Sequence, residues 1–363
     1  MKKILCLILC LIFASFMLVS CGDDEIGKVP DHYPEPKPEI EEVSLNLYVI
    51  VDEATSDNAM KTVSRMIAQH TLSTYYTEVN VKYVSANEYA TVALNAVNST
   101  GEDAANIVLV NSYDLMTKLV DTGKIENVNP YLQLSAYGTL NVKIPSTLFD
   151  ACTWGVDEEG NDIIYAVPNN HVIGQYQYLV IDREVAEQQL KYSLTELLSY
   201  TSYDATVALR ADMERAGYNA EEYVYIQSGA YALKGELEAN NKNVCNVVQM
   251  PTVDINEAYS SAFAIVDTGN DVVDNRAMEI IYALNNDVEL RNLLQYGVYG
   301  TNYTLSDDGE ILMVDDETNT YRMKLEYTGN IFVASYCDEI GWTAEIAKNG
   351  EKQNADSVFV SAN

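Results

Sequence analysis

The chain has 363 residues, with 54 acidic against 22 basic side chains and a formal net charge of −32 at pH 7. A polypeptide this negative repels nucleic acid and anionic lipid surfaces, so we expect no nucleic-acid partner. The acidic excess does not identify a ligand, because dispersed carboxylates commonly serve solubility.

A hydrophobic leader opens the chain. Lys2 and Lys3 precede an apolar run from Ile4 to Val19. Crossing a bilayer takes about 20 apolar residues, and this run is shorter. Together with the basic start, it predicts a secretory signal peptide over residues 1–20 rather than a membrane span.

The leader ends in the sequence LVSC, in which the cysteine is Cys21. This ending resembles the lipobox of bacterial lipoproteins. The resemblance implies that Cys21 is diacylated and becomes the mature N-terminus. Each buried methylene contributes about 0.8 kcal/mol, and two acyl chains give stable anchoring. We therefore expect a lipid-anchored protein on the extracellular or periplasmic face of the cell membrane. An ordinary secretory peptide that ends near a cysteine is the alternative.

Residues 21–42 are rich in proline and acidic side chains. Proline at this density favours extended polyproline II, and the surrounding carboxylates repel one another. The stretch therefore predicts a tether between the lipid and the folded part. Its clustered prolines are Pro30, Pro34, Pro36 and Pro38.

Strand and helix patterns alternate after residue 42. Buried-strand patterns occupy 43–51, 79–83 and 107–110, and helical spacing follows each of them. This order is typical of a mostly parallel sheet with helices on both faces, which binds ligands beyond the carboxyl ends of its strands. The predicted helix caps are Thr55, Ser56 or Asp57 for the first helix and Asn111 or Ser112 for the third.

The remaining pattern predicts further strands and helices. Residues 152–156 and 163–167 flank DEEGND and predict a β-hairpin with Gly160 in its turn. About 320 residues exceed what one core usually holds, so two lobes are expected. The other predicted elements are strands at 175–181, 244–250 and 262–266, helical segments in 183–218, a helix around 277–288 capped by Asp271 or Asp274 with Gly297 beyond its end, and a short helix around Trp342.

Three stretches carry a resemblance to the extracellular solute-binding proteins of ABC importers, in particular the lipid-anchored class with many sugar binders. They are VLVNSYDLMTKLVDTGKIENVNPYL at 108–132, IIYAVPNN at 163–170, and residues 261–305 with their long helix and trailing Gly-Tyr motif. The resemblance implies a two-lobed, periplasmic-binding-protein-like α/β fold, each lobe a mostly parallel sheet flanked by helices and joined by crossing hinge segments. The implied lobes are 43–168 with 263–298, and 172–258 with 303–363. The second lobe is short between 182 and 255, which puts its share of the site in doubt.

The resemblance also implies a function. A cleft between the lobes closes over a small solute, most often a sugar or oligosaccharide, by hinge motion. The closed protein then delivers the solute to an ABC permease in the membrane. No bond is broken in this process, so the resemblance implies a binding protein that is not an enzyme and needs no cofactor. It also implies a monomer.

Sugar sites pair aromatic planes with polar side chains, which selects candidate ligand residues. Each has a structural alternative: the asparagines fit helix caps or turns, and Trp342 fits core packing. The candidates are Asp52, Glu53, Asn111 and Tyr113 at strand ends, Asn169, Asn170, Gln175 and Tyr176 at or after the crossing, and Tyr303 and Trp342 from the return side.

Metal and enzyme signals are weak. The three cysteines of the exported part match no zinc spacing and allow at most one disulfide, the histidines are isolated, and the acidic runs near residues 307 and 316 lack a calcium-loop spacing, so no metal site is predicted. Two Asp-Thr-Gly triplets, at 121–123 and 267–269, occur also in aspartic proteases, but both lie among helices. A surface hydrolase of polysaccharide or peptide, and a surface adhesion or scaffold lipoprotein, remain as alternatives.

Overall fold

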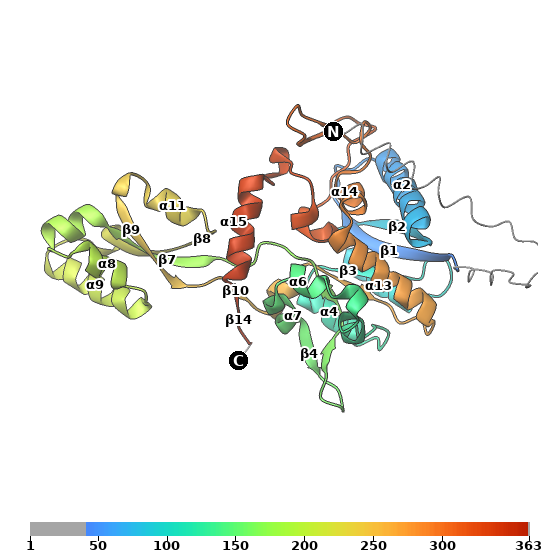
Figure 1. Ribbon diagram of the computed structural model, residues 1–363, viewed down its shortest axis with the longest axis horizontal. Helices are drawn as coiled ribbons and strands as arrows, with labels where there is room; N and C mark the ends of the chain where they lie inside the picture. The colour runs from blue at the N-terminus through green and yellow to red at the C-terminus, as the bar shows by residue number, and fades with distance from the viewer. Residues whose placement is uncertain (1–40, 362–363) are drawn as a thin grey trace, which may run out of the picture. The chain divides into compact units, whose positions relative to one another are not determined.

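A computed structural model describes residues 41–361 (Figure 1). The predicted signal peptide, Cys21 and the tether up to residue 40 lie outside the described residues and stay predictions. Between residues 41 and 361, the structure contains no helix with the length and apolar character that a membrane span requires.

A five-stranded sheet with the order β2-β1-β3-β11-β6 forms the core of what we call the first lobe. β1, β2 and β3 are parallel, whereas β11 pairs antiparallel with both β3 and β6. The predicted mostly parallel sheet is confirmed here. Its central strands are buried because helices cover both faces. The strands are β1 (Val43–Val51), β2 (Thr77–Ser85), β3 (Ile107–Val110), β6 (Val167–Pro168) and β11 (Ala262–Ile265).

The direction of the crossovers separates the helices. The connection from β1 to β2 and the return from β2 to β3 move in opposite directions, and right-handed crossovers then place their helices on opposite faces. α2 accordingly contacts α13 and α14, whereas α3 contacts α4. Ser56 and Ser112, both among the predicted caps, accept backbone N–H groups at the starts of α2 and α4. The helices are α2 (Asp57–Tyr75), α3 (Tyr89–Asn98), α4 (Tyr113–Val120), α13 (Asp271–Asn286) and α14 (Val288–Tyr296).

The long helix predicted near residue 280 differs from the structure in two details. Asp287 has extended backbone and divides it into α13 and α14, and its side chain caps α14. The cap of α13 is Asn270, which accepts the N–H of the second helical residue. The predicted caps Asp271 and Asp274 are therefore wrong, and both lie in the first turn, where the helix dipole favours carboxylates. Gly297 follows α14, as predicted.

The predicted hairpin is confirmed, and it lies in the part of the chain that connects β3 to β6. β4 and β5 pair antiparallel, and Gly160 in their turn has a φ of 85°. Short helices fill the chain before it. These elements are α5 (Asn129–Leu132), η1 (Ser135–Tyr137), α6 (Leu140–Lys143), α7 (Ser146–Cys152), β4 (Thr153–Val156) and β5 (Asp162–Ile164).

A separate three-stranded sheet, β8-β7-β9, forms the core of the second lobe. Both outer strands run antiparallel to β7, which corrects the predicted mostly parallel sheet of this lobe. The reason is the chain path: β7 enters the lobe, and β8 and β9 both run back against it. The elements are β7 (Tyr176–Asp182), the π-helical turn η2 (Val185–Gln189), α8 (Leu194–Ser199), α9 (Tyr203–Arg215), α10 (Ala220–Tyr223), β8 (Val224–Gly229), α11 (Leu233–Leu237), η3 (Ala239–Asn241) and β9 (Asn243–Gln249).

The C-terminal segment returns to the first lobe before α15. Tyr321 and Met323 belong to the first hydrophobic core, and Trp342 and Ala347 pack with Tyr296 of α14 in a smaller cluster. These contacts concern the segment 303–363, which the sequence assigned to the second lobe; the division into lobes as a whole stays a prediction. The remaining elements are β10 (Thr252–Val253), α12 (Ile255–Ala258), β12 (Tyr303–Leu305), β13 (Ile311–Met313), η4 (Leu325–Thr328), η5 (Ile331–Val333), η6 (Asp338–Ile340), α15 (Ala344–Ala355) and β14 (Val358–Phe359).

Candidate functional site

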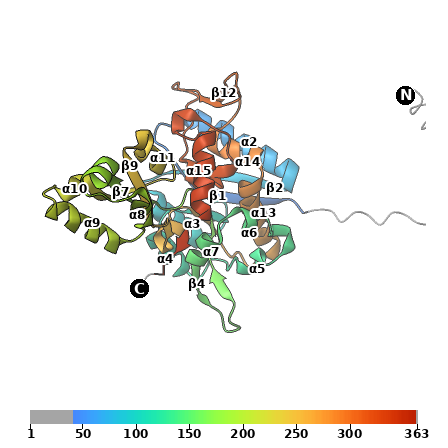
Figure 2. The ribbon, with the colours of Figure 1, turned by 60° about the vertical axis from the view of Figure 1, so that its left-hand side comes forward.

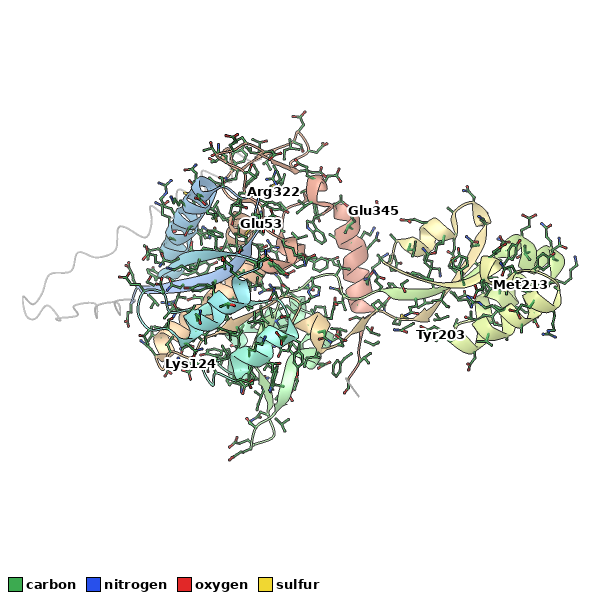
Figure 3. All side chains as sticks on the ribbon, turned by 180° about the vertical axis from the view of Figure 1, so that it is seen from behind. Glu53, Lys124, Tyr203, Met213, Arg322 and Glu345 are labelled. Carbon is green, nitrogen blue, oxygen red and sulfur yellow. The ribbon has the colours of Figure 1, made fainter. Side chains whose placement is uncertain are left out.

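The carboxyl edge of the first sheet, where the sequence predicted part of the site, is lined by the chain's own segment 320–328. The N–H of Asp52 donates to the carbonyl of Arg322 at 3.3 Å, and the N–H of Ser56 donates to the carbonyl of Thr320 at 2.9 Å. Asp52 and Glu53 are exposed beside this segment, and Figure 3 shows Glu53 and Arg322 in the same region. These two carboxylates therefore border the edge on its solvent-exposed side.

Asn111 and Tyr113 lie at the start of α4. Tyr113 is half-buried, with its ring 5.7 Å from Trp154 and 6.1 Å from Tyr259 between centroids. Ser112, and not Asn111, caps the helix. Tyr113 thus belongs to an aromatic group at the margin of the first core.

Asn169 and Asn170 are buried in the segment that crosses between the lobes. The Asn169 amide donates to the hydroxyl of Ser261 at 2.9 Å and to the carbonyl of Glu326 at 3.1 Å, while its Oδ1 has no protein partner within the described residues. The Asn170 amide donates to the carbonyl of Lys143 at 2.7 Å. Both side chains therefore hold the crossing segment to distant parts of the chain, and they do not form a local turn.

Tyr303 and Trp342 lie elsewhere. Tyr303 packs edge-on against Tyr299, with ring centroids 5.8 Å apart. Trp342 is buried against Phe332 and lines a hollow of about 470 Å³. The ten predicted residues are therefore distributed over several places, and the structure does not bring them into one site.

Tyr176 is the predicted residue that lies in an aromatic groove. This tyrosine groove, of about 690 Å³, is lined by residues of the second sheet, of α11 and of α15. The three elements can be followed in Figures 1 and 2. Gln175, the predicted neighbour, is exposed just before β7 and is not among the lining residues. The lining consists of Tyr176, Tyr178, Tyr231, Ala232, Lys234, Gly235, Glu236, Glu238, Val247, Met250, Glu345, Asn349 and Asp356.

Three tyrosines form the aromatic part of the groove. The rings of Tyr176 and Tyr178 are stacked, with centroids 5.4 Å apart and an interplanar angle of 22°. Tyr231 meets Tyr176 edge-on at 6.1 Å. The Tyr176 hydroxyl donates to Oδ2 of Asp356 at 2.7 Å, which ties the second sheet to the end of α15. Burial, followed by the hydrogen bond to Asp356, raises the pKa of Tyr176, so the phenol stays neutral.

The local pattern explains why these residues converge. Side chains two apart on a strand share a face, so Tyr176 and Tyr178 both point away from the helices that cover Leu179 and Ile181. On α15, Glu345 and Asn349 are four residues apart and share a face. The sequence interpretation missed Tyr178, Tyr231 and the α15 residues; the YQY alternation and the helical period after Trp342 were the available signals.

The two segments that connect the lobes are fixed by α15 and by each other. The Gln353 amide donates to the carbonyls of Ile173 and Gly174 at 2.8 and 2.7 Å, and Oδ1 of Asn354 accepts the N–H of Ile173 at 2.8 Å. On the return, β10 pairs parallel with β14. These contacts hold both connecting segments against the C-terminal part of the chain.

One acidic group within the described residues could hold a cation. Carboxylate oxygens of Glu126, Asp267 and Asp274 lie within 4.8 Å of one another. Burial raises the pKa of Glu126 and of Asp274, and Asp274 accepts the hydroxyl of Thr268 at 2.7 Å. The triplet at 267–269 thus leads into α13. Asp274 in the first turn of that helix accepts hydrogen bonds from the N–H and the hydroxyl of Thr268.

Comparisons with known proteins show the fold. No family model matches the chain, and no curated protein matches its sequence. Among solved structures, it is similar to the N-glycan transport solute binding protein NgtS from Streptococcus pneumoniae, with a TM-score of 0.54 and 14% identity over 87% of this chain and 83% of that chain. The NgtS complex with Man1GlcNAc gives 0.53 and 13% over 87% and 84%, and the complex with Man5GlcNAc gives 0.52 and 14% over 86% and 82%. The chain therefore has the two-lobed α/β fold of extracellular solute-binding proteins.

Proposed function

We propose that this protein is the substrate-binding component of an ABC importer, which captures a sugar or oligosaccharide in the tyrosine groove and hands it unchanged to a membrane permease. The observation that carries the proposal is the groove itself: stacked tyrosines face the polar side of α15 in a chain with the solute-binding fold. The NgtS structures with Man1GlcNAc and Man5GlcNAc support an oligosaccharide as the ligand class.

The groove offers the two kinds of contact that a sugar needs. The apolar C–H face of a pyranose packs against an aromatic ring such as that of Tyr231, which is half-buried and rests on the buried Tyr176. Its hydroxyl groups require hydrogen-bond partners, which the carboxylate of Glu345 and the amide of Asn349 can provide. A ligand that contacts both the second sheet and α15 would favour the closed arrangement, because it binds that state better.

We also propose that Cys21 carries the lipid anchor, which would keep the binding protein near its permease. The lipobox-like LVSC ending supports this assignment. Mass spectrometry of the protein from bacterial membranes should find two acyl chains on Cys21, and Cys21→Ser should release it into the soluble fraction. A mature protein cleaved elsewhere, without acyl chains, would refute the anchor.

A thermal-shift screen of the purified protein against oligosaccharides and peptides tests the function. A ligand at a hundred times its Kd stabilises the folded state by about 2.7 kcal/mol, which raises the melting temperature measurably. The recovered ligand is then analysed by chromatography. An unchanged ligand supports the binding protein, whereas shortened products would establish the hydrolase. A protein that no member of the panel stabilises would contradict the proposal and favour the adhesion or scaffold role.

A further inference from the structure

The polar oxygens of the tyrosine groove are mostly hydrogen-bond acceptors. Tyr176 donates its hydroxyl proton to Asp356, and Tyr178 donates its own to the carbonyl of Ala230 at 3.2 Å. A phenol has a single proton to donate, so neither hydroxyl has a proton left for a ligand, and both tyrosines are buried in the floor of the groove. Burial raises the pKa of Tyr178 to about 12, which keeps this phenol neutral at physiological pH.

Carboxylates dominate the charged lining of the groove. Glu236 and Glu238 lie at the end of α11, and Glu345 and Asp356 lie at the two ends of α15. Lys234 is the cation among the lining residues, and the lining contains no arginine. Glu238 accepts the N–H of a β9 residue at 3.1 Å, which uses part of its acceptor capacity. The charges around a bound ligand are therefore mainly negative.

A second lysine beside the groove is already engaged. The ammonium of Lys352 stands 4.8 Å from the ring centroid of Tyr231 and 3.5 Å from its hydroxyl oxygen. This cation–π contact orients Tyr231 from the side of α15. Lys234 therefore remains as the cation of the lining beside Glu236, Glu238, Glu345 and Asp356.

We propose, on the basis of the function proposed above, that the groove selects sugars that carry hydroxyl, amide or ammonium groups and rejects sugars that carry a carboxylate. Sugar hydroxyls and ammonium groups donate hydrogen bonds, which matches a lining of carboxylate acceptors. A uronic or sialic carboxylate only accepts, and proteins hold such groups with arginine or lysine forks. Here it would meet the carboxylates of Glu236, Glu238, Glu345 and Asp356, with Lys234 as the cation of the lining and no arginine fork.

Matched sugars test the selection by isothermal titration of the purified protein. The panel pairs glucose, galactose and mannose with their 2-amino forms and their uronic acids, and pairs lactose with 3′-sialyllactose. We expect each acidic sugar to bind at least about tenfold more weakly than its neutral partner at low ionic strength, with the ratio falling as salt screens the carboxylates. The 2-amino forms should bind at least as tightly as the neutral sugars.

Charge-neutral variants locate the cause. The double variant Glu236→Gln, Glu345→Gln should bring the Kd values of neutral and acidic sugars closer together, because it removes two carboxylates from the lining. Both side chains are exposed, so the fold should persist. Glu310→Gln, an exposed carboxylate beside β13, should leave the ratio unchanged. An acidic sugar that binds as tightly as its neutral partner would overturn the selection while leaving the binding function intact. A panel without any binding would contradict the proposed function and this inference with it.

Discussion

His171 and Glu257 join the two segments that connect the lobes, with Nε2 of His171 3.3 Å from Oε1 of Glu257. Nδ1 of His171 lies 2.8 Å from the carbonyl oxygen of Asn169, which only accepts, so Nδ1 carries a proton. Nε2 faces a carboxylate oxygen, which also only accepts. The hydrogen bond from His171 is the largest influence on Glu257 and lowers the pKa of that carboxyl, which is therefore ionised at neutral pH. The Glu257 carboxylate therefore accepts from Nε2 of His171 and links the two connecting segments.

This pair makes the stability of the protein dependent on pH. A carboxyl whose pKa is lowered by folding stabilises the folded state above its ordinary value of 4.5, and that contribution is lost as the pH falls through the folded value. Glu257→Gln should therefore lower the free energy of unfolding by about 1–3 kcal/mol at neutral pH, and by less in acid. Urea unfolding from pH 3 to 7 measures the difference. Glu310→Gln serves as the exposed control, and a Glu257→Gln deficit that does not change with pH would refute the contribution of the ionised carboxylate.

Gly174 marks the close approach of the two connecting segments. Its φ is +50°, and a Cβ atom at this position would lie 2.5 Å from the carbonyl oxygen of Thr252. Gly174→Ala should destabilise the protein by about 2–4 kcal/mol, because it adds a backbone clash to an unfavourable φ. Thermal unfolding measures the loss. Gly155→Ala is the matched control, since nothing lies within 4 Å of its Cβ position and its melting temperature should stay close to that of the unmodified protein. Equal melting temperatures for the two variants would show that the segments separate freely.

Local patterns predicted the elements of the first lobe because strands and caps are encoded within short windows. The run 43–51 alternates little and is buried on both faces, which is the signature of a central strand. Ser112 precedes an apolar helical period, and it caps α4 as such a residue should. These features depend on neighbours within a few residues, so the sequence alone contains them.

The site depended on distant contacts, which no local pattern encodes. Asp356 accepts a hydrogen bond from Tyr176, which lies 180 residues earlier in the chain. The carbonyl of Arg322 likewise accepts the N–H of Asp52, which follows β1. The direction of β8 and β9 against β7 likewise follows from the chain path and not from any strand's composition. The resemblance supplied the fold class, but it could not place individual side chains around the groove.

Asp287 connects α14 to the end of α2. Its Oδ2 accepts the Tyr75 hydroxyl at 2.8 Å and lies 2.8 Å from Nε2 of His70, while Oδ1 accepts the N–H of Glu289. Burial alone would raise the pKa of Asp287, but the hydrogen bonds from His70 and Tyr75 outweigh it and lower the pKa below 3.8.

The variant Asp287→Asn tests this charge, because the amide oxygen keeps the cap and loses the ionised acceptor. We expect a loss of about 1 kcal/mol near neutral pH. A carboxyl with a lowered pKa contributes above its ordinary value and stops contributing as the pH falls through the folded value, so the loss should disappear in strong acid. Chemical unfolding at several pH values measures it, with the exposed Asp308→Asn as control. A loss of constant size would assign the effect to packing.

Tyr231→Ala separates ligand binding from folding. The ring of Tyr231 is half-buried at the groove, and the hydrogen bond that this residue makes to Gln353 comes from its backbone N–H, which the substitution retains. The fold should therefore persist, whereas a sugar loses one aromatic surface and should bind about tenfold more weakly. Tyr299→Ala removes a more exposed ring, which packs on Tyr303 outside the groove, and should leave the affinity unchanged. Titration of both variants with the sugar found by thermal shift decides the matter, because an unchanged Kd in Tyr231→Ala with normal circular dichroism would place the ligand elsewhere in the protein.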